Sequence, residues 1–171
     1  EEMAQATNAI LDYIGPVYMR TGRGDTNRIL DHTYKFQIGK GSILCDGVDV
    51  TIVACGVEVA RALQASEALK KDGISARVVN ISTIKPIDDE LLEKCAKETG
   101  AIVTAEDHSI IGGLGGAVAE SLAKTIPPPI EFVGTNHVFG ESGEPEELSE
   151  KYHICSNSIV TAVKNVIKRK K

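Results

Sequence analysis

Two arginines close together could bind an anion. Arg20 and Arg23 stand three positions apart in Met19-Arg20-Thr21-Gly22-Arg23-Gly24, next to glycines that keep the backbone open. A guanidinium group binds phosphate or carboxylate oxygens through two parallel hydrogen bonds, so the pair is a candidate site for an anionic substrate. From the residues alone, ordinary surface arginines are the commoner explanation.

A second group combines acids, a histidine and a glycine-rich segment. Glu106-Asp107-His108 follows an apolar run and precedes the glycine-rich start of a helix, Gly112–Gly116. One interpretation is an acid–base group above an anion-binding helix N-terminus. The alternative is that the glycines allow close helix packing while the polar residues hold a loop or an interface. A dinucleotide site is not expected, because Val118 occupies the place of the third glycine in G-x-G-x-x-G.

The other reactive residue types do not form recognisable sites. Gly39-Lys40-Gly41 lacks the hydroxyl that a phosphate-binding loop needs after its lysine, so nucleotide hydrolysis is not expected. The cysteines have no metal-ligand spacing, which argues against zinc and favours reduced thiols in a cytoplasmic protein. They stand at Cys45, Cys55, Cys95 and Cys155. We therefore predict no metal site and no catalytic residue in this chain.

Composition limits the function further. The 171 residues are 42% hydrophobic and carry a net charge of −5, which suits a globular protein and gives no reason to expect nucleic acid or an anionic membrane as a partner. No apolar run reaches the ~18 residues of a membrane span. The chain opens inside a helical pattern, at Glu1-Glu2-Met3, so we expect it to have been cut from a longer polypeptide.

Strands that alternate with amphipathic helices must position these residues. The pattern predicts an α/β fold with three α/β/α layers and a mostly parallel five-stranded sheet that has one antiparallel edge strand. We expect strands at 42–45, 49–55, 76–81, 101–105 and 130–133, the first two forming a hairpin through Asp46-Gly47. Ligands of such sheets bind at the carboxyl ends of the strands, which points to Gly56, 82–86, 106–116 and 135–143.

The ends of the chain add shorter elements. Residues 1–14 are expected to form a helix that Gly15-Pro16 ends, followed by a short strand at 17–19. A one-turn helix is expected near 145–150, and a last helix from Ser156 or Ser158. The initial helix and strand have no partners of their own before them, so we interpret them as the end of another domain.

Four phrases along the chain resemble transketolase, in that family's order and at about its spacing. They are Phe36–Gly41, Ser82–Asp88, Glu106–Gly115 and Phe139–Leu148. The resemblance implies that residues 1–25 are the tail end of a pyrimidine-binding domain, that 26–41 are a linker, and that 42–171 are a transketolase C-terminal domain.

The resemblance also implies a function for the complete enzyme. It would be a thiamine-diphosphate-dependent transferase of the pentose phosphate pathway that moves a two-carbon ketol unit between sugar phosphates. Thiamine diphosphate and Mg²⁺ would bind the upstream domains, and none is expected to bind this chain alone, which we expect to be inactive by itself. The expected partners are the remaining transketolase domains or an N-terminal subunit, the sugar-phosphate substrate, and a second copy in a homodimer of the complete enzyme.

The family resemblance assigns roles to the candidate residues. Arg23 matches an arginine that helps to bind the substrate phosphate, and Arg20 is a second candidate that could equally be a linker contact. Glu106, Asp107 and His108 become structural or interface residues, because the family's catalytic histidines lie in upstream domains. The alternatives are the matching domain of deoxyxylulose-phosphate synthase or of a 2-oxoacid dehydrogenase beta subunit, and a non-catalytic regulatory or assembly module.

Overall fold

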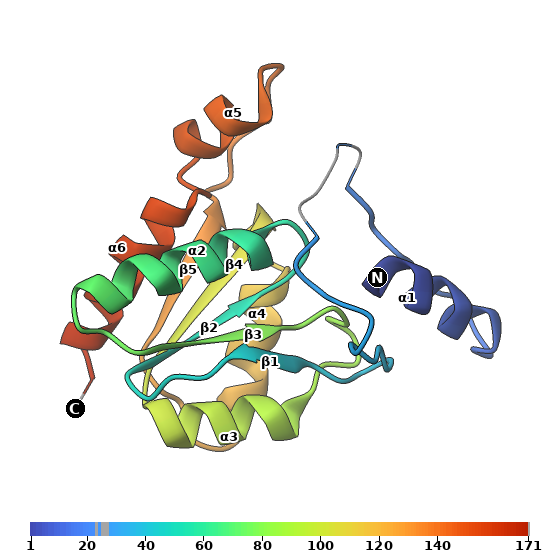
Figure 1. The fold of residues 1–171 in the computed structure, drawn as a ribbon, viewed down its shortest axis with the longest axis horizontal. Helices are drawn as coiled ribbons and strands as arrows, with labels where there is room; N and C mark the ends of the chain where they lie inside the picture. The colour runs from blue at the N-terminus through green and yellow to red at the C-terminus, as the bar shows by residue number, and fades with distance from the viewer. Residues whose placement is uncertain (23, 25–27, 171) are drawn as a thin grey trace.

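A five-stranded sheet forms the centre of the structure, a computed structural model that describes residues 1–22, 24 and 28–170 (Figure 1). The strand order is β1-β3-β2-β4-β5, with β1 antiparallel and the other pairs parallel. The strands are β1 (Ser42–Cys45), β2 (Val50–Ala54), β3 (Ala76–Asn80), β4 (Ile102–Ser109) and β5 (Ile130–Thr135). The predicted mostly parallel sheet with one antiparallel edge is confirmed.

Helices cover both faces of this sheet. On one face, α2 (Glu58–Lys71) and α6 (Ser156–Lys168) pack over a core that includes Ile52, Val78 and Val103. On the other, α3 (Asp89–Thr99) and α4 (Leu114–Leu122) pack over a core that includes Val53, Val79 and Ile102. Every residue of β2 and β3 is buried, which explains the nearly continuous apolar sequence of β2. The two buried polar residues of β3 are hydrogen-bonded, Arg77 to Glu98 and Asn80 to Glu2. The predicted three-layer arrangement is therefore confirmed.

The predicted hairpin of the first two strands is wrong. β1 pairs with β3, and β2 lies one place further into the sheet. Gly47 is needed for a close approach to β3 instead of a tight turn, since a Cβ there would lie 2.4 Å from the carbonyl carbon of Ala76 and from the amide nitrogen of Arg77. The Asp46-Gly47 pair thus carries the chain closely past the start of β3.

Most helix ends follow their sequence signals. The Asp88 side chain accepts a hydrogen bond from the Leu91 N–H at 3.2 Å at the start of α3, and Gly100, with φ of 68°, ends it. The helix α5 (Pro145–Lys151) is longer than the one turn expected. β4 continues to Ser109, so Glu106, Asp107 and His108 belong to the strand instead of following it.

The first helix lies beside the sheet (Figure 1), and polar side chains connect it to β3 and to the segment before β1. This helix, α1 (Glu2–Leu11), ends three residues earlier than expected, and residues 17–19 form no strand. The Glu2 carboxylate accepts hydrogen bonds from the Tyr34 hydroxyl at 2.6 Å and from the Asn80 amide at 2.7 Å. Burial and this carboxylate raise the pKa of Tyr34 to about 12. The division into residues 1–25, 26–41 and 42–171 stays a prediction.

Candidate functional site at the carboxyl ends of the central strands

The candidate site lies where the strand order reverses. The chain leaves β2 to form β3 on one side and returns to form β4 on the other side. The carboxyl ends of β2 and β4 therefore flank the place where ligands usually bind in such sheets. Cys55 and Gly56 follow β2, and Glu106, Asp107 and His108 complete β4 next to them.

Glu106 is engaged by the N-terminus of α4. Its side chain is buried and accepts hydrogen bonds from the backbone N–H groups of Leu114 and Gly115, both at 2.8 Å. A carboxylate at this position is stabilised by the partial positive charge of the helix N-terminus. Gly113 makes room for it, since a Cβ there would lie 1.9 Å from a Glu106 carboxylate oxygen. The chain's own carboxylate thus occupies the anion position that the glycine-rich segment suggested for a ligand.

Arg20 is brought to Asp107 by the segment that follows α1. Its guanidinium donates a hydrogen bond to the Asp107 carbonyl oxygen at 2.7 Å and forms an ion pair with the Asp107 carboxylate at 3.1 Å. Both side chains are about half exposed. The contact joins the segment after α1 to the end of β4, across 87 positions of sequence.

The structure says less about the other two predicted site residues, Arg23 and His108. Arg23 lies outside the described residues, so its predicted phosphate contact stays a prediction. His108 is exposed, and its Nδ1 lies 3.2 Å from the Ser109 carbonyl oxygen.

Sequence reasoning missed Glu58 and its arginine partner. Glu58 opens α2 and is fully buried, and its Oε1 accepts a hydrogen bond from Arg61 at 2.5 Å. Its Oε2 is buried without a hydrogen-bond partner among the described residues. Burial raises the pKa of Glu58 to about 7, against the opposing effect of Arg61, and the nearby Asp107 raises it further. An acid in the first turn of a helix usually faces solvent, so the sequence carried no signal for this burial.

Cys55 lies close to the same carboxylates and is not an activated nucleophile. Burial, and then the charge of Glu106, raise the pKa of its thiol to about 12. A thiol is a nucleophile only when it has lost its proton, so Cys55 is inert near neutral pH. The described part of this site therefore suits the positioning of backbone and segments better than bond-making chemistry.

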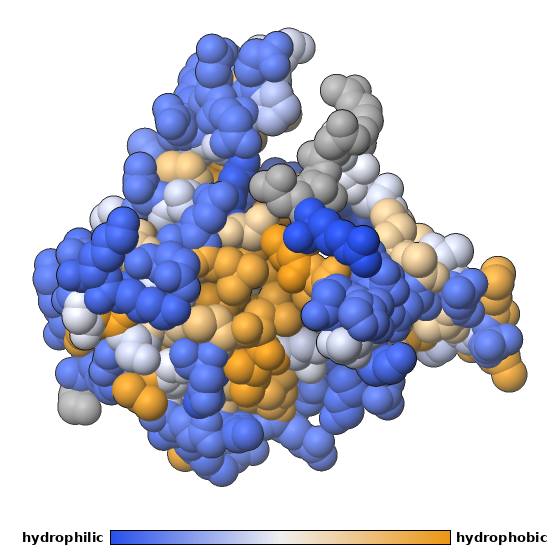
Figure 2. Space-filling model, in the orientation of Figure 1, coloured by the Kyte–Doolittle hydropathy of each residue, from blue (hydrophilic) through white to orange (hydrophobic). Residues whose placement is uncertain are grey.

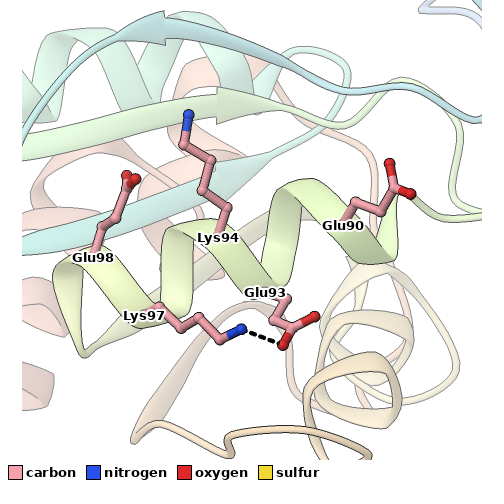
Figure 3. Close-up of a pocket in the computed structure, with 5 residues that line it drawn as sticks. All are labelled: Glu90, Glu93, Lys94, Lys97 and Glu98. Carbon is pink, nitrogen blue, oxygen red and sulfur yellow. Dashed lines mark ion pairs between the residues drawn. The ribbon is translucent and has the colours of Figure 1, made fainter.

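Open depressions elsewhere on the surface are lined by charged side chains. One of about 440 Å³ follows the outer side of α3 between Glu90 and Glu98, and Figure 3 shows Lys97 turned to Glu93 in an ion pair of 2.6 Å. In the described part of the chain, no three His, Cys, Asp or Glu side chains gather as metal ligands. The helices described there are all too short or too polar to cross a membrane.

Known proteins match nearly the whole chain. The family model for the transketolase C-terminal domain matches residues 39–159. A putative transketolase C-terminal section from Methanocaldococcus jannaschii is 47% identical over 163 residues, which cover 94% of this chain and 51% of that protein. The 6-deoxy-6-sulfo-D-fructose transketolase subunit SqwH of Clostridium sp. (strain MSTE9) is 44% identical over 169 residues, 99% of this chain and 52% of that protein.

A synthase relative and a solved structure extend this result. The 1-deoxy-D-xylulose-5-phosphate synthase of Heliobacterium modesticaldum is 33% identical over 168 residues, 96% of this chain and 26% of that protein. A structure described as a split gene transketolase, inactive beta4 tetramer, has a TM-score of 0.93 and 46% identity, covering 98% of this chain and 56% of that one. The chain thus spans about half the length of the transketolase relatives it matches. It belongs to the transketolase family and carries the family's C-terminal domain.

Proposed function

We propose that this chain is the C-terminal section of a thiamine-diphosphate-dependent transketolase that moves a two-carbon ketol unit between sugar phosphates. The observation that carries the proposal is the extent of the match. The domain model begins at residue 39, but similarity to a transketolase section of about twice this chain's length extends through the segment before it and covers 94% of the chain. A complementing section would supply the remaining domains.

The cofactor is assigned to that complementing section. The described residues of this chain offer no cluster of metal ligands, and its sequence lacks a Gly-Asp-Gly segment followed by paired asparagines for a magnesium diphosphate. When bound, thiamine diphosphate supplies a carbanion and an electron sink for cleavage of the donor sugar. The chain's own contribution would be anion binding and the positioning of segments next to the substrate.

Arg23 is our candidate for the substrate phosphate. A guanidinium in a glycine-flanked segment suits a terminal phosphate, which it can bind through two hydrogen bonds. Arg20 was predicted as a second phosphate ligand, and its contact with Asp107 supports a different role, in which it holds the segment that carries Arg23. Glu106 would fix the start of α4 in the same region.

The test is a ketol-transfer assay with and without the complementing section. The chain alone, given thiamine diphosphate, Mg²⁺, xylulose 5-phosphate and ribose 5-phosphate, should give no product. The chain mixed with a complementing section that contains all the remaining transketolase domains should give sedoheptulose 7-phosphate and glyceraldehyde 3-phosphate. Turnover by the chain alone, or none by the mixture with any ketose phosphate donor, would overturn the proposal. Conversion of pyruvate and glyceraldehyde 3-phosphate to 1-deoxy-D-xylulose 5-phosphate and CO₂ by the mixture would assign the chain to the synthase branch instead.

A further inference from the structure

Residues 2–20 form a strap that is tied to the sheet domain near each of its ends. The strap consists of α1 and the irregular segment 12–20, in which every residue is exposed. Apolar packing holds little of it, since Leu11 is 77% and Ile14 is 99% exposed. Figure 2 shows hydrophobic residues on the surface at the outer end of α1. Polar contacts among the described residues therefore set the position of the strap.

The first anchor of the strap is the Glu2 carboxylate. One of its oxygens, Oε1, accepts both the hydrogen bond from the Tyr34 hydroxyl and the one from the amide group of Asn80, the last residue of β3. Asn80 is buried and Tyr34 is partly buried, so water competes little for these bonds. A hydrogen bond to a charged acceptor that is shielded from water is stronger than an exposed one. Glu2 therefore ties the start of α1 to the carboxyl end of β3.

Gln5 strengthens this anchor by pairing with a short piece of backbone. Its side-chain amide donates a hydrogen bond to the Tyr34 carbonyl oxygen at 2.8 Å and accepts one from the Phe36 N–H at 2.9 Å. The two bonds flank Lys35, whose own side chain is exposed. Residues 34–36 are thus held against α1 as a neighbouring strand would hold them.

The second anchor lies at the other end of the strap. The Arg20 guanidinium binds the carbonyl oxygen and the carboxylate of Asp107, near the end of β4. Because β2 separates β3 from β4 in the sheet, the two anchors lie on opposite sides of the point where the strand order reverses. A strap that is tied at one end keeps its other end close to its partner, which makes the second contact easier to form. The two anchors should therefore stabilise each other.

We propose that Glu2 is a positioning residue, which together with Arg20 holds the strap as one cooperative unit across the carboxyl ends of β3 and β4. Arg23 follows the strap closely in sequence. Glu2 therefore acts from a distance on the phosphate-binding segment of the proposed function. This consequence for the substrate rests on the proposed function, whereas the cooperation of the two anchors does not.

Limited trypsin digestion of the full chain, followed by mass spectrometry, tests the cooperation. Trypsin cleaves after Lys35 only when the backbone there has left α1, and after Arg20 only when that side chain has left Asp107. Glu2→Ala should speed cleavage after Lys35 by about tenfold and, through the coupling, cleavage after Arg20 by about threefold. Glu2→Gln should restore most of the protection, because its single amide oxygen can accept the same two hydrogen bonds. Asn8→Ala, an exposed position on the same helix, is the matched control and should change neither rate.

The second anchor supplies the reciprocal test. Asp107→Ala should speed cleavage after Arg20 directly and cleavage after Lys35 through the coupling. If each substitution changes only the rate at its own anchor, the two anchors are independent and the proposed cooperation is overturned. If Glu2→Ala leaves the rate at Lys35 unchanged as well, Glu2 is not an anchor.

Steady-state kinetics of the chain mixed with its complementing section test the consequence for the substrate. Glu2→Ala should raise KM for the ketose phosphate by about fivefold with little change in kcat, and Glu2→Gln should leave both near their original values. An unchanged KM for Glu2→Ala would overturn the role of Glu2 in substrate positioning. Inactivity of the unaltered mixture would overturn the proposed function, whereas digestion of the chain alone would still decide whether the two anchors cooperate.

Discussion

Glu58 combines full burial with a single charged partner. Its carboxylate pairs with Arg61, while Asp107 and Glu146 lie near enough to disfavour its negative charge. The pKa of Glu58 is raised to about 7 from the ordinary 4.5. The unfolded chain therefore loses this proton near pH 4.5, and the folded chain keeps it until about pH 7. The contribution of this bound proton to the free energy of unfolding is therefore fully present below pH 4.5 and is lost as the pH rises through 7.

Glu58→Gln should remove this pH dependence. We expect the free energy of unfolding of the variant, relative to that of the unaltered chain, to increase by about 3 kcal/mol between pH 4.5 and pH 8, since the amide needs no proton to stay neutral. Urea unfolding at several pH values measures the difference, and Glu120→Gln on the surface is the control. A difference that does not vary with pH would contradict the assignment.

The two arginines should respond differently in the reconstituted enzyme. Arg23→Ala should lower kcat/KM for phosphorylated substrates by an amount equivalent to about 1.5–3 kcal/mol, the scale of a charged hydrogen bond, and affect unphosphorylated acceptors less. If Arg20 acts through Asp107, Arg20→Ala should affect both substrate types equally, and adding Asp107→Ala should cost little more. A loss for Arg20→Ala that is confined to phosphorylated substrates would restore it as a phosphate ligand.

At the scale of elements, the start of α4 depends on a glycine that leaves room for Glu106. Gly113→Ala should destabilise the chain by about 2–3 kcal/mol, because its Cβ would overlap the Glu106 carboxylate and displace it from the helix N–H groups. Gly116→Ala, inside the same helix and with nothing within 4 Å of the added Cβ, should be neutral or stabilising. Equal unfolding midpoints for the two variants would show that Glu106 does not hold the helix.

Signals that act over a few residues predicted most of the elements. The cap at Asp88, the stop at Gly100 and the apolar run of β2 each follow from local chemistry, and each was found in place. The Asp46-Gly47 pair led to the wrong hairpin prediction, because a glycine suits both a tight turn and a close approach of two backbone segments. Only the position of β3 decides between the two. Local sequence cannot contain that information.

Long-range contacts explain what the sequence could not predict in the candidate site. Arg20 and Asp107 meet across 87 positions, and no pattern in either segment indicates the other. Glu58 has the sequence signature of an ordinary first-turn acid, yet it is buried beside Arg61, which also donates a hydrogen bond to the distant Ile154 carbonyl oxygen. The position of Glu106, Asp107 and His108 at the carboxyl end of a strand could be anticipated, but their partners could not.

At the scale of the whole molecule, the sheet domain has a hydrophobic core on each face of the sheet, whereas the N-terminal segment buries few of its apolar side chains. Among the residues of α1, only Ala6 is buried, and apolar side chains of this segment such as Leu11, Ile14 and Tyr18 are largely exposed. This contrast supports the proposal that the segment belongs to a domain whose other parts lie in the complementing section.

Hydrogen exchange should reveal the same division. In the chain alone, amides of α1 should exchange within seconds to minutes, because local opening of the helix exposes few apolar contacts. Amides of β2 and β3, which are buried on both faces, should exchange only through global unfolding. Mass spectrometry of peptic fragments provides the comparison. Equal protection of α1 and β2 would contradict a separate N-terminal body.

The central claim is that this chain supplies one section of a two-section enzyme, and an activity titration tests it most directly. A fixed amount of the complementing section, which contains all the remaining transketolase domains and is saturated with thiamine diphosphate and Mg²⁺, receives increasing amounts of the chain while ketol transfer is followed. We predict activity that rises from zero and saturates at one chain per complementing section. Activity that is present before the chain is added and does not change on titration, or that never appears, would contradict the claim.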